Sequence, residues 1–248
     1  KLIISRASIR FSLDNDLYLL DAKTKKAEHL TAHDAATQYG DVEFLDNNTI
    51  LFATNHDREF YNPARMDLRS KKIQTLNNMN WDTDAIQVSH DGAMLAHTLN
   101  REGFSELFVT ETKSFGQKST PVPLPAKGTV GGLEFSKAGS KLAFTFSGAK
   151  YNGDIWTYDL FTKKLTQVTK SSRSGIPRES FVEPELIKFK SFDGREIPAW
   201  YYKPNPVNPR VVPMGSEPMT TGVKNLPVII SVHGGPEGQE RAGFNPLY

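Results

Sequence analysis

The residues best suited to chemistry are His233-Gly234-Gly235, which directly follow the apolar run from Leu226 to Val232. An uninterrupted apolar run of this kind predicts a strand that is buried on both faces. Two glycines at the end of such a strand let the backbone turn sharply and leave its N–H groups unobstructed by Cβ atoms. Donors of this kind can bind the negative oxygen that develops on an attacked carbonyl. Gly234 and Gly235 are therefore candidate oxyanion-binding residues, and a simple strand-to-loop turn is the alternative.

A nucleophile to accompany these donors is missing from the sequence. The strained turn that activates a catalytic serine has the pattern Gly-x-Ser-x-Gly, which occurs nowhere in the 248 residues. The nearest pattern is Gly103-Phe-Ser105-Glu-Leu107, which lacks the second glycine. The chain has no cysteine either, so cysteine nucleophiles, disulfides and zinc–thiolate sites are excluded. No residue of a catalytic triad is therefore assigned.

The other histidines lie in segments that are rich in strand signals, where we expect them to be ordinary polar or packing residues. Pairs of possible metal ligands occur close in sequence, but each lacks a convincing third ligand. We therefore predict no metal site and no cofactor. The histidines are His29, His33, His56, His90 and His97, and the ligand pairs are His29 with His33 and His56 with Asp57.

Charge and hydropathy limit the partners that the chain can take. Thirty Lys and Arg residues against 28 Asp and Glu leave a net charge of +2, far from the concentrated positive field that nucleic-acid binding requires. No apolar run approaches the ~20 residues of a membrane helix, so we expect no membrane span. The chain begins at Lys1, so we expect any signal peptide to be missing from it, and cytoplasm and periplasm both stay open. The sequence leaves the oligomeric state undetermined.

A repeat sets the frame that must position the candidate loop. An Asp followed three residues later by Ser or Thr and then by two lysines occurs at Asp21, Asp67 and Asp159. The first two of these residues lie 46 positions apart and the last two lie 92 apart, which is twice that interval. The lysine pairs could form a basic binding face. Because each pair occurs at the same turn of its own repeat, the pattern instead favours solvent-exposed lysines at hairpin tips.

A second phrase interleaves with the first. Val88 to Ala96 returns as Phe135 to Ala143, shifted by 47 residues, and Phe44 to Phe52 is a looser copy. Short apolar or alternating runs separated by turn residues predict about four strands per unit of 40 to 50 residues, which is the period of a β-propeller blade. Residues 1–172 hold about three and a half such units. That number is too small to close a ring, so we expect the chain to start in mid-propeller.

The sequence changes character after the last repeat. Residues 173–185 are polar and read as a linker. Leu186 to Phe192 and Arg195 to Lys203 predict the two strands of a hairpin, joined by the tight-turn dipeptide Asp193-Gly194. Pro204 to Asn225 contains five prolines and predicts an irregular excursion before the apolar run.

The order of these features resembles the prolyl oligopeptidase family of serine peptidases. The resemblance is most specific in two segments, Phe189-Lys-Ser-Phe-Asp-Gly-Arg-Glu-Ile-Pro-Ala-Trp-Tyr-Tyr-Lys-Pro204 and Pro227-Val-Ile-Ile-Ser-Val-His-Gly-Gly-Pro-Glu237. It implies a propeller that caps an α/β-hydrolase domain and a Ser/Asp/His triad that cleaves short peptides. It also implies that backbone donors at Gly234 and Gly235 form part of the oxyanion hole, with His233 as an adjacent structural residue.

On this basis we expect a mainly β chain, with a partial propeller over residues 1–172, a linker over 173–185 and the start of an α/β-hydrolase domain over 186–248. In the resembling family the triad lies beyond such a segment. The chain by itself is therefore expected to be an inactive fragment of a serine peptidase with a peptide substrate. Two other functions stay open: a stand-alone propeller that binds a protein or peptide, and an esterase or acyl hydrolase on the same scaffold.

Overall fold

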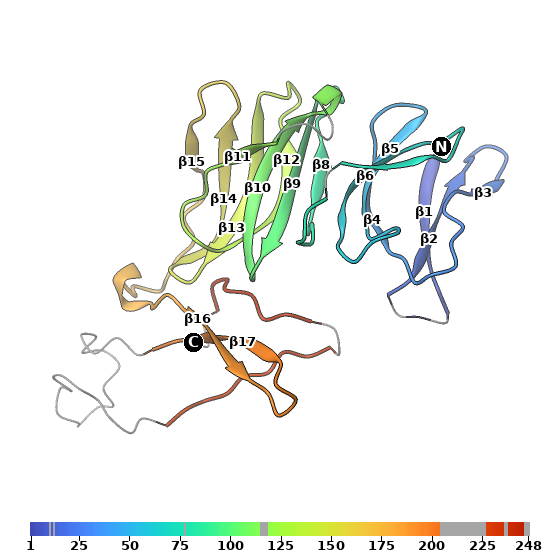
Figure 1. Ribbon diagram of the computed structural model, residues 1–248. Coiled ribbons are helices and arrows are strands. Elements are labelled where there is room, and N and C mark those ends of the chain that lie inside the picture. The colour runs from blue at the N-terminus through green and yellow to red at the C-terminus, as the bar shows by residue number, and fades with distance from the viewer. Residues whose placement is uncertain are drawn as a thin grey trace, which may run out of the picture.

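The structure is a computed structural model that describes residues 1–9, 11, 13–76, 78–114, 119–203, 227–235 and 238–245. It is built almost entirely from antiparallel sheets that follow one another along the chain (Figure 1). No helix among the described residues is long and apolar enough to cross a membrane. The strands of the repeat region are β1 (Leu2–Ala7), β2 (Asn15–Leu20), β3 (Ala27–His29), β4 (Tyr39–Phe44), β5 (Thr49–Thr54), β6 (Asn62–Asp67), β7 (Ile73–Thr75), β8 (Ile86–Val88), β9 (Met94–Arg101), β10 (Phe104–Glu111), β11 (Thr120–Val122), β12 (Thr129–Phe135), β13 (Lys141–Gly148), β14 (Tyr151–Asp159) and β15 (Leu165–Gln167).

These strands form three four-stranded sheets, β4–β7, β8–β11 and β12–β15, and one three-stranded sheet, β1–β3. Within each sheet every strand pairs with the next one along the chain, which is the meander of a propeller blade. The hairpin that carries Asp21 joins β2 to β3, as the hairpin of Asp67 joins β6 to β7. The strands of the first sheet therefore correspond to the second, third and fourth strands of the other sheets. The predicted partial propeller is confirmed.

The repeated Asp residues occupy equivalent hairpin positions, as predicted. One carboxylate oxygen of each accepts hydrogen bonds from the backbone N–H groups two and three residues later, at 2.9 and 2.8 Å for Asp21, 3.2 and 2.8 Å for Asp67, and 3.1 and 2.8 Å for Asp159. The lysine four positions after each Asp has a φ between +56° and +61°. Because the Asp oxygen satisfies N–H groups that the tight turn leaves unpaired, the short sequence motif determines the hairpin locally.

The second repeated phrase also folds alike in two sheets. Gly92 and Gly139 have φ values of +69° and +66° and each donates its N–H to the carbonyl of the serine three residues earlier, at 2.8 Å. The sheet β8–β11 departs from the other motif, because its third strand leads into a 3₁₀ helix, η1 (Thr112–Ser114), in place of the Asp hairpin. This departure accounts for the doubled interval between Asp67 and Asp159.

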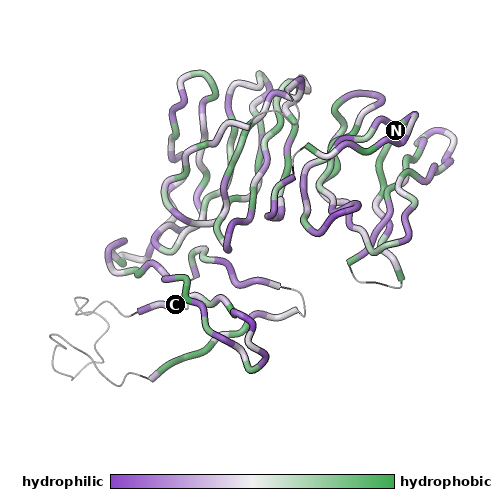
Figure 2. Tube along the Cα trace, viewed as in Figure 1, coloured by the Kyte–Doolittle hydropathy of each residue, from purple (hydrophilic) through white to green (hydrophobic). Residues whose placement is uncertain are grey.

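The hydrophobic core lies between neighbouring sheets. One cluster joins β8–β11 to β12–β15 through buried residues such as Leu107, Phe135 and Phe144, and a second joins β1–β3 to β4–β7 through residues such as Leu17 and Phe52. A smaller cluster links the two middle sheets. The alternating burial of β13, with every second residue buried, shows the period of two that orients these side chains. Figure 2 shows hydrophobic residues, in green, along the strands of the sheets. Packing of blade on blade therefore holds the repeat region together.

A separate hairpin follows the propeller. It consists of β16 (Glu185–Lys190) and β17 (Glu196–Tyr201), which pair in antiparallel register. Gly194 has a φ of +82° at its turn, and Ser191 N donates to Arg195 O at 2.8 Å. Between β15 and β16 lies a short 3₁₀ helix, η2 (Arg178–Ser180). The predicted hairpin about the Asp-Gly dipeptide is confirmed.

The predicted buried strand before the candidate loop is wrong for the residues that the structure describes. Residues 227–232 form no strand, and the side chains of Val228, Ile229 and Val232 are 79, 93 and 82% exposed. A central strand needs paired strands beside it and packed layers over both faces, and the described ranges place neither next to this run. The excursion Pro204–Asn225, together with Leu226, Pro236 and Glu237, lies outside the described residues.

Candidate functional site

The two ends of the propeller differ in what lies against them. Because the strands of each sheet are antiparallel, the Asp hairpins all lie at one end, and the β1–β2, β5–β6, β9–β10 and β13–β14 turns lie at the other. The β16–β17 hairpin and residues 238–245 pack against this second end, which we call the docking end (Figure 1). The candidate loop therefore belongs to the part of the chain that meets the propeller.

Trp200 of β17 anchors the hairpin to the docking end. Its ring meets the ring of Phe104 edge to face, with 4.9 Å between centroids. The Cα of Gly103 lies against the same indole so closely that a Cβ there would be 2.7 Å from Trp200 Cζ2. The indole Nε1 donates to the carbonyl of Glu240 at 2.9 Å. One side chain thus ties together the β9–β10 turn, the hairpin and the segment that follows the candidate loop.

Arg241 anchors that segment to the propeller itself. Its Nε donates to Gly103 O at 2.8 Å, its Nη1 contacts Asp84 Oδ2 at 2.9 Å, and its Nη2 donates to Ser105 Oγ at 3.2 Å. The side chains of Arg241 and Asp84 are 24% and 29% exposed, so the ion pair is partly shielded from water. A guanidinium fork that meets three acceptors fixes orientation as well as position.

Further contacts continue along the segment. Asn100 Nδ2 donates to Gln239 Oε1 at 2.7 Å, and the backbone N–H of Phe244 donates to Ser147 Oγ at 2.9 Å. Ala242 is buried, with 1% of its surface exposed. The ring of Phe244 meets that of Phe181 edge to face at 5.2 Å. Residues 238–245 therefore contact the ends of β9 and β13, in two adjacent sheets, and the residues that precede β16.

The candidate oxyanion loop lies immediately before this anchored segment and is exposed to solvent. His233 Nδ1 is 2.9 Å from Gly234 O, and no atom lies within 4 Å of the place where a Cβ of Gly234 would be. Gly235 has a φ of +149°. A Cβ at Gly238 would lie 2.7 Å from Gly234 O, so the loop and the anchored segment touch. The loop is therefore exposed to solvent around Gly234, and the carbonyl of Gly234 contacts Gly238.

The predicted donors Gly234 and Gly235 precede the segment that docks on the propeller, and their role stays a prediction. Sequence reasoning missed Arg241 and treated Trp200 as an ordinary strand residue. A cue was available for both, because a tryptophan in an exposed two-stranded hairpin and an arginine just past a glycine-rich loop each need a partner. The identity of those partners, Gly103 and Asp84, depends on the tertiary contact.

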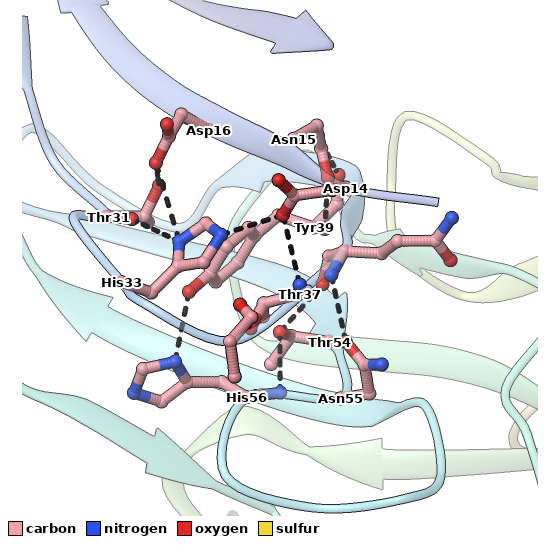
Figure 3. A network of polar contacts seen from close by, with 12 residues as sticks. Asp14, Asn15, Asp16, Thr31, His33, Thr37, Tyr39, Thr54, Asn55 and His56 are labelled. Atoms are coloured by element: carbon pink, nitrogen blue, oxygen red, sulfur yellow. Dashed lines mark hydrogen bonds and ion pairs between the residues drawn. The ribbon is translucent and has the colours of Figure 1, made fainter. Parts of the chain in front are cut away.

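A polar network occupies the docking end of the first two sheets (Figure 3). His33 Nε2 contacts Asp14 Oδ1 at 2.8 Å and its Nδ1 contacts Thr31 O at 2.6 Å. Tyr39 Oη is 3.0 Å from His56 Nδ1, and the Tyr39 ring lies against that of His33. The network therefore links the β1–β2 turn, the β3–β4 connection and the β5–β6 turn.

The network sets the ionisation of its members. Burial lowers the pKa of His33, but hydrogen bonds to Asp14 and Thr31 and the nearby carboxylates outweigh it and hold the pKa above its ordinary value. A hydrogen bond from Thr37 N, joined by the one to His33, holds the pKa of Asp14 below its ordinary value. Burial raises the pKa of Tyr39, which keeps its hydroxyl neutral. A cavity of about 360 Å³ lies beside the network, lined by Tyr39 and His56 among others.

The remaining histidines take the packing and surface roles that the sequence predicted. His97 is buried at 1% exposure and stacks on Phe108 with 5.4 Å between ring centroids. His29 stacks on Tyr18 and contacts Asp16, whereas His90 is exposed. In the described part of the chain no three His, Cys, Asp or Glu residues are grouped so that they could hold a metal ion.

Comparison with known proteins bears on the fold. No protein-family model and no curated protein sequence matches the chain. Solved structures do match it. A puromycin-hydrolysing peptidase of Mycobacterium tuberculosis is 13% identical with a TM-score of 0.66 over 82% of this chain and 31% of that one. Prolyl oligopeptidase B of Galerina marginata is 15% identical with a TM-score of 0.63 over 75% and 27%.

Dipeptidyl peptidase 4 of Porphyromonas gingivalis is also similar, with 15% identity and a TM-score of 0.60 over 79% of this chain and 29% of that one. The chain thus spans between 27 and 31% of the length of these three peptidases. At such identities the likeness concerns the path of the backbone, and it extends over 75 to 82% of this chain. The chain therefore has the fold of a region of the prolyl oligopeptidase-type peptidases.

Proposed function

We propose that the chain is part of a serine peptidase of the prolyl oligopeptidase type. In this proposal the propeller covers a catalytic domain that begins near the β16–β17 hairpin, and the complete protein hydrolyses short peptides by a Ser/Asp/His mechanism. The triad lies outside these 248 residues, which contain no Gly-x-Ser-x-Gly turn. The chain supplies the propeller, the junction and the backbone donors of the candidate loop.

One observation carries the proposal. The segment that follows His233-Gly234-Gly235 docks on the end of a propeller whose fold is shared with peptidases of this type. The candidate loop, which has open space around the Cβ position of Gly234, immediately precedes this docked segment. Ligand sites occur preferentially at such domain interfaces. This supports an oxyanion-binding role for Gly234 and Gly235 over that of an ordinary turn.

The chemistry expected of these donors follows from where charge develops. Attack on a peptide carbonyl places negative charge on its oxygen, and preorganised N–H groups stabilise that charge without reorganising at the moment of reaction. Loss of one such donor lowers the rate by roughly a hundred- to a thousand-fold in serine peptidases. The propeller covers one side of the junction, and access past it limits the substrates to short peptides.

The test uses the complete product of the gene and a serine-directed fluorophosphonate probe. We expect hydrolysis of short chromogenic peptides, covalent labelling by the probe, and loss of hydrolysis in proportion to labelling. The 248-residue chain, assayed in parallel at equal concentration, is expected to show neither reaction, because it lacks the nucleophile.

Two outcomes contradict the proposal in different ways. Labelling with hydrolysis of p-nitrophenyl esters but of no peptide identifies an acyl hydrolase on the same scaffold. A complete protein that neither reacts with the probe nor hydrolyses either substrate is not a serine hydrolase, and the propeller is then a binding module.

A further inference from the structure

We propose that Arg241 is a positioning residue through which the propeller determines the geometry of the candidate oxyanion loop. The inference rests on the proposed function and deepens it, because it assigns the propeller a part in catalysis besides covering the site. Arg241 touches no reacting atom in this scheme. It acts by fixing the segment that immediately follows Gly234 and Gly235.

The first step is the specificity of the anchor. Two of the three acceptors of Arg241, Gly103 O and Ser105 Oγ, flank the first residue of β10, and the third, Asp84 Oδ2, comes from the connection between β7 and β8. The guanidinium therefore joins the β9–β10 turn and the connection that leads into β8 to the segment beyond the candidate loop. A lysine ammonium can keep the contact with Asp84, but it cannot meet all three acceptors in one plane.

The second step is the tight frame around these acceptors. Gly103 has a φ of +86°, and its N–H is bonded to Asn100 Oδ1 at 3.0 Å. Ser105 is buried, its N–H donates to Gly128 O at 2.8 Å, and its Oγ accepts from Val130 N at 3.0 Å. The acceptors are thus held by the β9–β10 turn and the neighbouring sheet. Because these acceptors are held rigidly, they fix the position of the Arg241 guanidinium that binds them.

The third step links the anchor to the loop. The carbonyl oxygen of Glu240, the residue before Arg241, accepts a hydrogen bond from Trp200 Nε1. Two successive residues of the segment are therefore fixed. Gly238 lies against Gly234 O, where a Cβ would come within 2.7 Å, and a Cβ there would also lie 3.0 Å from His233 Nδ1. Gly238, three positions before Arg241, is therefore in direct contact with Gly234. A shift of the anchor therefore moves Gly234.

The expected effect is a loss of rate at nearly unchanged affinity. Misplacement of a catalytic group by about 1 Å can cost on the order of a hundred-fold in rate. We expect Arg241→Ala to lower the kcat of the complete protein roughly ten- to a hundred-fold, with KM changed far less, because the loss falls on an interaction that is stronger in the transition state. Arg241→Lys is expected to retain part of the kcat through its contact with Asp84.

The matched control is Arg195→Ala. Arg195 contacts Asp193 at 3.3 Å in the β16–β17 turn, and its side chain is 83% exposed. Removing it deletes an arginine–aspartate pair from the turn between β16 and β17 without touching the docking end. Its kcat is expected to equal that of the unaltered protein.

Hydrogen exchange followed by mass spectrometry on the same preparations of the complete protein measures the anchor independently of activity. Arg241→Ala is expected to speed exchange in peptides that cover residues 238–245, where the Phe244 N–H is bonded to Ser147 Oγ. Exchange in β12–β14 is expected to stay unchanged, which distinguishes local release from unfolding. Asp84→Asn is expected to give a smaller change in the same peptides.

Three results overturn the inference. Unchanged exchange at residues 238–245 in Arg241→Ala shows that the arginine is no anchor. Faster exchange with an unaltered kcat shows an anchor that positions nothing in catalysis. Absence of hydrolysis from the unaltered protein rejects the proposed function and with it the positioning role, while the exchange data still decide whether Arg241 holds the segment.

Discussion

Gly103 presents its bare Cα to the indole of Trp200, because a Cβ at this position would lie 2.7 Å from Trp200 Cζ2. Gly103 also has a φ of +86°, which L side chains rarely adopt. We expect Gly103→Ala to destabilise the protein by roughly 1–3 kcal/mol, since it adds a clash to the backbone strain. Urea denaturation followed by circular dichroism measures this change.

The matched control is Gly175→Ala. Gly175 has a similar φ of +78°, but no atom lies within 4 Å of a Cβ there. This variant carries the backbone strain without the clash, so roughly 1 kcal/mol is expected. Equal losses of stability in the two variants would indicate that the Trp200 ring moves aside without cost and is not packed rigidly against the β9–β10 turn.

Gly235→Val tests the candidate loop directly. Gly235 is exposed and has a φ of +149°, so a valine distorts the loop while it leaves the propeller core untouched. In the complete protein we expect kcat to fall roughly a hundred-fold or more and the melting temperature to change little. Kinetics and thermal unfolding on one preparation measure both.

A structural turn at Gly235 predicts the reverse pattern, with a lower melting temperature and full activity per folded molecule. Gly194→Val is the control, because Gly194 has a positive φ in an open turn of the β16–β17 hairpin, away from the candidate loop. It is expected to leave kcat unchanged.

His97 makes the propeller sensitive to acid. Burial lowers the pKa of His97 to about 4, whereas an unfolded histidine titrates near 6.5. The unfolded state therefore binds the extra proton first, and stability falls as pH drops from about 6.5 towards 4, by about 3 kcal/mol in all. In His97→Leu we expect a flatter pH dependence over this range, measured by urea denaturation at several pH values. A variant with the same slope as the unaltered protein removes His97 as the cause.

His33 affects the pH dependence of stability in the direction opposite to His97. Its pKa is raised in the folded protein, so the stability it contributes is fully present below about 6.5 and is lost as pH rises through the folded pKa. We expect His33→Gln to lower the melting temperature more at pH 5.5 than at pH 8.5. An equal loss at both pH values indicates that the ring contributes by packing against Tyr39 and not by its charge.

The Asp hairpins predict a ranked effect of substitution. Asp159→Ala removes an acceptor that serves two backbone N–H groups, whereas Asp159→Asn keeps an oxygen in the same place. We expect the alanine variant to melt at a lower temperature than the asparagine variant at pH 7. The bond from Thr162 N holds the pKa of Asp159 below its ordinary value, so its contribution is present above about pH 4 and fades as pH falls through the folded pKa. Equal melting temperatures for the two variants would show that the hairpin forms without the hydrogen bonds to the Asp159 side chain.

The sequence by itself determined the features whose hydrogen bonds close within a few residues. The Asp hairpins satisfy their own backbone N–H groups, so a motif of six residues was enough to place them. Their spacing then predicted the blades, and the Asp193-Gly194 turn predicted the hairpin. In each case a local pattern has few alternative structures.

The tertiary structure decided what the local pattern left open. The apolar run before His233 has the composition of a buried strand, yet it is exposed here, because burial requires partner strands and layers that a sequence window does not contain. Likewise, neither Arg241 nor Trp200 carries a signal that names Gly103 as its partner. Those contacts join residues more than ninety positions apart, and only the packing of the docking end brings them within hydrogen-bonding distance.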